Sequence, residues 1–400
     1  MEEKTKPQAR TRDLGKGSIP KLLAQLAIPV VVAQIVNLLY NIVDRIYIGH
    51  IPGIGAAALT GVGLFAPILM LINAFAMLSG SGGAPRAAIF MGKKDNETAE
   101  KIMANGFSKI SMMTTLIGAV INVILDPIFI FVFDMGVRGA AIATVLSQAV
   151  GAIWVLRFLT GEKTILKLKL SNMKLDPKVF GPCLALGISS FVMISTESLL
   201  SISFTSSLAR YGGDVAVGAM TIITSVNQLI TMPLQGICQG GQPIISYNFG
   251  AGNKDRVKKA FFTQFFVCAA FTIAGWLVMM IVPQLFAGLF TSDTNLVDYT
   301  SWALHIYMAG IFSIGFQVSC QQSFMALGQA KVSLLLACLR KIVLLIPLIF
   351  ILPCFLADKV FAVFLAEPIS DILAATVTTI TFLTRFDKIL EVGVQVKKGD

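Results

Sequence analysis

Long runs of apolar residues separated by short polar gaps make up most of this chain. The hydrocarbon core of a bilayer is about 30 Å thick, so a helix needs about 20 apolar residues to cross it. Because several runs exceed that length, we expect some helices to be tilted, bent or extended beyond the membrane. The pattern predicts an all-α polytopic membrane protein with about ten transmembrane helices. They fall at roughly 22–48, 57–83, 111–133, 139–159, 180–208, 215–245, 260–288, 300–326, 332–355 and 360–384.

The composition excludes most other classes of protein. The chain is 55% apolar and only 14% charged, whereas a soluble globular chain is about 45–50% apolar and about 25% charged. A soluble fold, a disordered chain and a disulfide scaffold are therefore excluded. No nucleophile–base pairing or metal-ligand spacing stands out in the sequence, so we expect no enzyme, no cofactor and no metal beyond a possible Na⁺.

Basic residues are distributed unevenly among the polar gaps, and this distribution predicts the orientation of the chain. Lysine and arginine are retained on the cytoplasmic side of membrane proteins. They crowd the N-terminal tail, the gap at 84–110, the central loop and the C-terminal tail, but the outer gaps hold only Arg45, Arg138, Arg210 and Lys359. We therefore expect both termini in the cytoplasm and the chain in the plasma (inner) membrane. The net charge of +10 then reflects topology, with the lipid bilayer rather than nucleic acid as its partner.

The two halves of the chain resemble each other. Residues 82–102 match residues 240–260 without a gap, so that Gly92 pairs with Gly250 at an offset of 158. Further on, Lys109-Ile110-Ser111 pairs with Lys331-Val332-Ser333 at an offset of 222. The change of offset indicates a parallel repeat whose first copy lacks about 64 residues, enough for two helices.

This repeat divides the chain into two helical lobes. We expect a cytoplasmic N-terminal tail (1–20), a first lobe (21–160), an interlobe loop (161–178), a second lobe (179–386) and a cytoplasmic C-terminal tail (387–400). Losing an even number of helices preserves the topology, which is consistent with the charge pattern.

Polar side chains at membrane depth are the main functional candidates, because ionisable groups inside a bilayer cost about 2.5–3.5 kcal/mol on insertion scales. Asn37, Asn41 and Asp44 follow one face of the first helix, and Asn122 and Asp126 are one turn apart on the third. Their oxygens suit a sodium ion, or a carboxylate pair that shares a proton. The candidate residues for coupling to H⁺ or Na⁺ are Asn37, Asn41, Asp44, Asn122, Asp126, Thr144 and Glu197.

Two prolines are candidate hinges. Pro127 directly follows Asp126, and Pro29 lies within the first helix. A proline inside a helix removes a backbone donor and bends the helix. We therefore expect the first and third helices to be able to bend at these positions.

A second group of polar residues is a candidate for lining a substrate cleft. Amides in a helical bundle also bond simply from helix to helix, so this assignment is the weaker of the two. Asp371 could equally pair with a lysine or lie near a wet cavity. The group comprises Gln34, Gln148, Asn227, Gln228, Gln235, Gln239, Glu367 and Asp371.

Several segments resemble the multidrug and toxic compound extrusion (MATE) family, nearest its bacterial MepA-like branch. The resemblance covers about residues 15–390. It rests on VNLLYNIVD (36–44), GGAPRAA (82–88), INVILDPIFIF (121–131), GVRGAAIATVLSQ (136–148) and LGISSFVMISTES (186–198). The family implies two helical lobes around a central cleft that export organic cations and drugs by alternating access, in exchange for H⁺ or Na⁺.

The resemblance also implies roles for individual residues. Asp44 matches the aspartate of the first family helix, and Asn122 and Asp126 match the N-x-x-x-D that helps to bind the coupling ion. Thr144 matches a hydroxyl of the next helix, and Glu197 matches an acidic position of sodium-coupled members. An acid found in some members on the tenth family helix has no counterpart between 300 and 326.

The sequence thus favours an antiporter that acts as a monomer on small organic cations. Two alternatives remain open at this point. One is a flippase of the same superfamily for lipid-linked precursors, for which Arg340 and Lys341 are the only deep basic pair. The other is a non-transporting remnant that has lost two helices.

Overall fold

The structure is a computed structural model that describes most of the second half of the chain and parts of the first. The described residues are mostly helical, and no strand occurs among them. The predicted helix at 57–83 lies almost wholly outside this part, and the predicted helices at 111–133 and 139–159 are described only in pieces. The described residues are 14–49, 83–95, 98–99, 121, 124–133, 135, 138–139, 142–147, 149–150, 153, 157, 177–290 and 294–398.

The described chain contains helices of three kinds. The labelled α-helices are α1 (Ile19–Gly49), α6 (Pro177–Gly250), α7 (Lys254–Ile281), α8 (Pro283–Gly288), α9 (Thr294–Tyr307), α10 (Ile314–Ala326), α11 (Ala330–Cys338), α12 (Ile346–Phe355) and α13 (Lys359–Lys398). The π-helical segments are η1 (Ile128–Val132) and η4 (Leu339–Leu345), and the 3₁₀ segment is η3 (Met308–Ser313).

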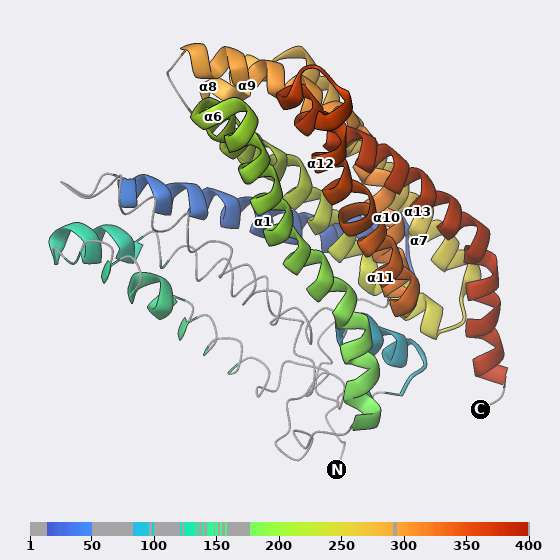
Figure 1. Cartoon of the computed structure of the whole chain (residues 1–400). Helices are drawn as coiled ribbons and strands as arrows, with labels where there is room; N and C mark the ends of the chain where they lie inside the picture. Colours follow the sequence, from blue (N-terminus) through green and yellow to red (C-terminus); the bar gives the residue numbers. More distant parts are fainter. Residues whose placement is uncertain are drawn as a thin grey trace.

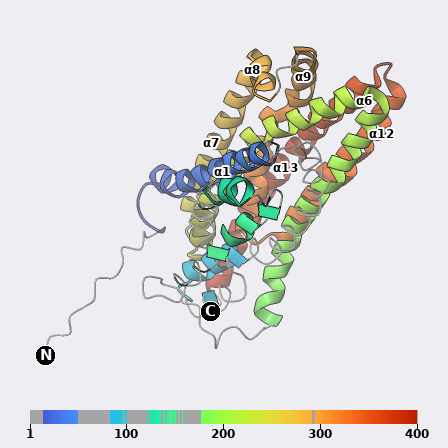
Figure 2. The same cartoon turned by 90° about the vertical axis from the view of Figure 1, so that its left-hand side faces the viewer.

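Six stretches of the described chain are long and apolar enough to cross a membrane. They are Ile19–Leu39, Ile194–Gly250, Lys254–Ile281, Thr294–Ala326, Lys331–Phe355 and Lys359–Glu391. Their composition and length confirm the prediction of an all-α polytopic membrane protein. In Figure 1 the stretches that follow α1 form a steep bundle that α1 crosses, and Figure 2 shows the same crossing from the side.

Two predicted helices, at 180–208 and 215–245, are the two arms of α6. The arms meet at Gly213, whose φ of 65° and ψ of −160° break the helix. Glycine reaches such a conformation because it has no Cβ. A Cβ on the neighbouring Gly212 would lie 3.1 Å from Val360 and 3.4 Å from Tyr299. The break therefore lies beside the beginnings of α13 and α9, at the end of the bundle opposite the end of α13 (Figure 1).

Some helix ends differ from the predicted ranges. The helix expected at 260–288 ends at Ile281, because Pro283 has no amide hydrogen to continue it and instead begins the short helix α8. The last helix continues to Lys398 rather than ending near 384, so the segment expected as a cytoplasmic tail prolongs α13.

The paired segments of the repeat end in the same backbone turn. The amides of Lys93, Lys94 and Asp95 donate to the carbonyls of Ile89, Met91 and Phe90. The amides of Ala251, Gly252 and Asn253 donate to Tyr247, Phe249 and Asn248, each of which lies 158 residues further on. The residue in the left-handed region is Lys94 (φ 66°) in the first copy and Gly252 (φ 74°) in the second. This is the usual glycine position of a helix C-terminus.

The same two segments also cross each other, at Gly92 and Gly250. A Cβ on Gly92 would overlap the carbonyl oxygen of Tyr247, and a Cβ on Gly250 would overlap that of Ile89. Ile89 and Tyr247 are themselves a pair at the offset of 158, so the contact is reciprocal. A two-fold relation between the two copies produces such a contact, as in an isologous interface.

The beginning of α1 packs on the second lobe. Ile19, Leu23 and Ala27 belong to a buried apolar cluster that also contains Phe261 of α7 and Phe382 of α13. Close approach is possible because small residues of α6 face α1: a Cβ on Gly236 would lie 2.9 Å from Val31.

Hydrogen bonds fix the segment that precedes α1. Arg256 donates to the carbonyls of Gly17 at 3.0 Å and Leu14 at 3.3 Å, and the buried Asn248 amide also donates to Leu14 at 3.0 Å. The first helix of one lobe is thus anchored to the turn between α6 and α7 in the other.

Candidate functional site

The first-lobe candidates are only partly described. On α1, Gln34 and Asn37 are half-buried, and Pro29 lies inside the helix. The backbone of α1 also carries Asn41 and Asp44, but their side chains lie outside the described part, as do Asn122 and Gln148.

Among the acidic residues described in the first lobe, Asp126 is fully buried. Its exposed fraction is 0%, and it lies at the end of a helical segment, directly before Pro127. Pro127 caps the π-helical turn η1, and π-turns inside helices occur frequently at functional sites. A buried carboxylate beside an irregular backbone is suited to holding a proton or a cation.

The next helix begins in contact with this turn. A Cβ on Gly139 would lie 2.6 Å from the carbonyl oxygen of Phe129, so the two backbones approach closely. One turn further on, Thr144 is half-buried, and the buried Ser147 donates to its carbonyl at 2.9 Å.

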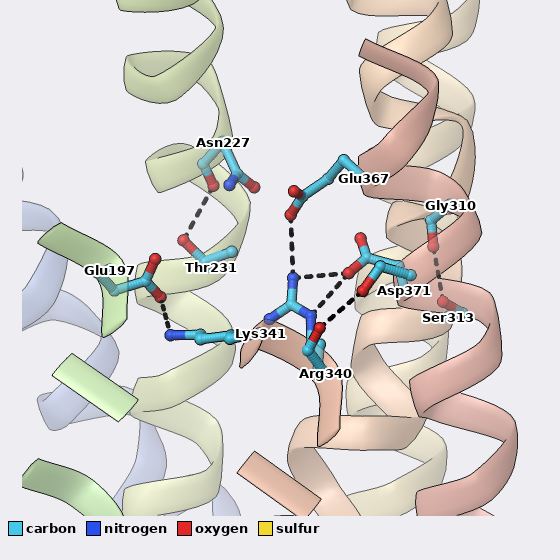
Figure 3. A network of polar contacts seen from close by, with 10 residues as sticks. Glu197, Asn227, Thr231, Gly310, Ser313, Arg340, Lys341, Glu367 and Asp371 are labelled. Atoms are coloured by element: carbon cyan, nitrogen blue, oxygen red, sulfur yellow. Dashed lines mark hydrogen bonds and ion pairs between the residues drawn. The ribbon is translucent and has the colours of Figure 1, made fainter. Parts of the chain in front are cut away.

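The second lobe holds a network of ionisable side chains that joins three helices (Figure 3). Arg340 of η4 donates through Nε to Asp371 at 2.8 Å, and its terminal nitrogen lies 2.6 Å from Asp371 and 3.1 Å from Glu367 of α13. Lys341 of η4 donates to Glu197 of α6. Charge-assisted bonds of this kind are short and strong.

Burial differs between the two sides of this network. Asp371 is 1% exposed, and Glu367 and Lys341 are also buried. The Glu197 side chain, by contrast, is 53% exposed. In this conformation Glu197 is therefore accessible from outside the packed helices, whereas Glu367 and Asp371 are not.

Both basic residues of the network lie on the π-helical turn η4. Arg340 and Lys341 are consecutive, so they point to different sides of the helix; here they reach α13 and α6 respectively. The hydroxyl of Ser370 also donates to the carbonyl of Arg340 at 3.0 Å, which fixes η4 against α13.

The remaining cleft candidates follow the second arm of α6. Gln235 and Gln239 are exposed, whereas Asn227 and Gln228 are half-buried. Thr231 donates to the carbonyl of Asn227 at 3.0 Å. In Figure 3 the Asn227 amide points toward the space beside Glu367.

The pairing of Glu197 was not predicted from the sequence. Glu197 is far along the chain from any basic residue, and its partner Lys341 is 144 positions away. Arg340 and Lys341 do carry a signal, because two adjacent cations inside an apolar run need counter-ions. For Asp371, pairing with a lysine was one of the two expectations; it is paired, but with an arginine, Arg340.

Comparison with protein families decides the assignment. The MatE family model matches residues 29–129 and 189–351, which together make up more than half of the chain. The chain belongs to the MatE family. The second of the two MatE matches is the longer. Together with the apolar helices, the match shows a multi-pass membrane protein.

Similar proteins carry related names. This MatE chain is 30% identical over 258 residues to "Multidrug export protein MepA" of Staphylococcus aureus (strain NCTC 8325 / PS 47), covering 62% of this chain and 54% of that protein. The chain thus spans about half the length of the curated relatives it matches.

Solved structures show the same fold. "Crystal structure of MATE in complex with MaL6" superposes with a TM-score of 0.87 at 21% identity, covering 94% of this chain and 98% of that one. "Outward-facing conformation of a multidrug resistance MATE family transporter of the MOP superfamily" gives a TM-score of 0.86 at 21% identity, covering 97% and 100%. The MatE chain therefore has the helical fold of MATE transporters.

Proposed function

We propose that this protein exports organic cations and drugs across the plasma membrane, by alternating access and in exchange for H⁺ or Na⁺. The observation that carries the proposal is the fully buried Asp126, adjacent to Pro127 and a π-helical turn, in a chain of the MatE family. Ionising a carboxylate in this environment is costly, and binding a proton or a cation lowers that cost. Binding and release at Asp126 then bias the bend of the helix.

The proposed site combines Asp126 with the side chains that the sequence pattern adds to it. Asp44, Asn122 and Thr144 supply a carboxylate, an amide and a hydroxyl. Ligand oxygens of these kinds suit both Na⁺ and a shared proton. The relatives named multidrug export proteins support small organic molecules as the cargo.

The charge of the second-lobe network favours cationic cargo over an anionic lipid-linked precursor. Arg340 and Lys341, the basic pair that a flippase would use, are both paired with carboxylates. The exposed member of the network is Glu197, which offers negative charge to the cleft.

Efflux of ethidium from pump-deficient bacterial cells tests the proposal. We expect cells that express the chain to lose the dye, and the Asp126→Asn variant to lose it at least tenfold more slowly. Asp298→Asn is the matched control, because Asp298 is exposed on α9. Equal export by wild type and Asp126→Asn would contradict the assigned role of Asp126.

A third form of the chain tests the shortened first lobe. It carries the two helices of a MepA relative inserted between the repeat segment ending at 102 and Lys109. Export by this form alone would identify the shorter chain as a remnant. If none of the forms exports ethidium although each protein is detected in the membrane, the export proposal is contradicted.

Dissipation of the ion gradients then identifies the coupling ion. In inverted membrane vesicles, export driven by H⁺ stops when a protonophore is added, and export driven by Na⁺ continues until a sodium ionophore is added.

A further inference from the structure

The second-lobe network contains more acids than bases. Three carboxylates (Glu197, Glu367 and Asp371) face two cations (Arg340 and Lys341). With all five ionised, these described groups carry a net charge of −1 inside the membrane, where an uncompensated charge is expensive. One proton or one further cation would neutralise it.

Two buried oxygen atoms of the described chain indicate where that positive charge belongs. Glu367 accepts from Arg340 through Oε1, but its Oε2 has no hydrogen-bond partner among the described residues. The Oδ1 atom of Asn227 is likewise buried without a partner there. A buried oxygen that stays unsatisfied destabilises the folded protein.

The two oxygens lie on facing helices. Asn227 belongs to α6 and Glu367 to α13, and these helices are in contact. Figure 3 shows the Asn227 amide pointing toward the Glu367 carboxyl. Both atoms are acceptors, so neither can satisfy the other without a hydrogen between them.

We propose that Glu367 is a proton-binding site of the second lobe, in which Glu367 Oε2 carries the proton and donates it to Asn227 Oδ1. The proton comes from water, forms an O–H bond on Oε2 and leaves again as the conformation changes. Once Glu367 is protonated, two ionised carboxylates and two cations remain among these groups, so their net charge is zero. One hydrogen also satisfies both orphaned oxygens.

A proton fits this position better than a sodium ion does. The cationic groups of Arg340 and Lys341 lie in the same network and repel any added metal cation. A proton needs one oxygen that carries it and one that accepts from it, which Glu367 Oε2 and Asn227 Oδ1 supply, whereas a sodium ion needs several oxygen ligands. The other titratable groups near Glu367 are Asp371 on its own helix, Glu197 on α6 and the buried Tyr307 of α9.

The role of Glu367 in transport rests on the proposed antiport, but its protonation is measurable without transport. Infrared difference spectra of the purified full chain in lipid nanodiscs detect the carbonyl stretch of a protonated carboxylic acid. We expect Glu367→Gln to remove one such band from the spectrum. The amide keeps an acceptor for Arg340 and mimics the neutral acid, so this variant is expected to fold.

Two further variants test whether the band belongs to Glu367 and whether Asn227 accepts its hydrogen bond. Glu391→Gln changes an exposed acid of the same helix and should leave the band unchanged. Asn227→Leu should retain the band but shift it to higher frequency, because the O–H group loses its acceptor.

The outcomes separate the two proposals. Loss of the band in Glu367→Gln, together with the shift in Asn227→Leu, supports the site even if no variant exports dye. An unchanged spectrum in Glu367→Gln overturns it. So does binding of ²²Na⁺ by the wild type that Glu367→Gln abolishes, since the site would then hold sodium.

Discussion

Arg340 shows how much of the second lobe depends on one side chain. Its guanidinium holds two carboxylates of α13, and its backbone carbonyl accepts from Ser370 of the same helix. Arginine suits this task because its donors form a rigid fork and it stays charged when buried. Such pairs add little net stability, but removing one partner is costly because the other charge is left uncompensated.

We therefore expect Arg340→Met to lower the free energy of unfolding by about 3–5 kcal/mol. Unfolding in detergent micelles measures the change. Arg385→Met removes an exposed arginine from α13 and should have little effect. The double variant Arg340→Met/Asp371→Leu should recover part of the loss, and a double variant less stable than Arg340→Met would contradict the explanation.

Lys94 is a second residue whose conformation has a measurable cost. It occupies the left-handed region with φ 66°, where its counterpart in the repeat is Gly252. A side chain there costs about 1–2 kcal/mol. Lys94→Gly should therefore stabilise the protein by about 1 kcal/mol, as measured by chemical unfolding. Lys93→Gly removes the same charge one residue earlier and should destabilise by about 0.5–1 kcal/mol; equal shifts for both variants would refute the argument.

At the scale of elements, the crossing of the helical segment 83–92 with the end of α6 holds the two lobes together. Its glycines face backbone carbonyls rather than side chains. A flexible side chain can move away from an added methyl group, but a helical carbonyl moves only with its helix. The crossing therefore tolerates less change than ordinary side-chain packing.

Gly250→Ala should destabilise the protein by about 1–3 kcal/mol, because the added Cβ forces the two helices apart. Gly288→Ala in α8 is the control, since no atom lies within 4 Å of its added Cβ. Thermal unfolding of both variants in nanodiscs compares them. Adding Gly92→Ala to Gly250→Ala should cost less than the sum of the two single changes, because both separate the same pair of helices; strict additivity would argue against a shared crossing.

The apolar runs predicted these elements well because hydropathy acts over a whole helix. Their ends were harder to predict. Nothing local distinguishes Gly213, which breaks α6, from the neighbouring Gly212, because the break depends on how the two arms pack. The pairing of Glu197 with Lys341 was unpredictable for a similar reason, since it requires α6 and η4 to be placed in three dimensions.

At the scale of the whole molecule, the turns of the second lobe fall into two sets. The break in α6 at Gly213 lies with the beginnings of α9 and α13, and the end of α13 lies at the opposite end of the bundle (Figure 1). The positive-inside pattern predicts that the first set faces outward, and that the α6–α7 turn and both termini face the cytoplasm.

Cysteine labelling in intact cells tests this orientation. In a version without native cysteines, Asp214→Cys should react with a membrane-impermeant maleimide, because it follows the break in α6 and is exposed. Asp255→Cys is equally exposed at the start of α7 and should react only after the cells are opened. Labelling of both positions, or of Asp255→Cys alone, in intact cells would reverse the predicted topology.

The reciprocal crossing has a consequence for how the gene can change. Gly92 is constrained by the backbone beside Tyr247, and Gly250 by the backbone beside Ile89, so two codons far apart in the reading frame specify one contact. Neither half of the duplicated sequence can diverge alone at this point, because no change of side chain in the other half makes room for a larger residue. Both copies of the repeat are therefore expected to keep glycine at this position, even where whole helices are gained or lost elsewhere.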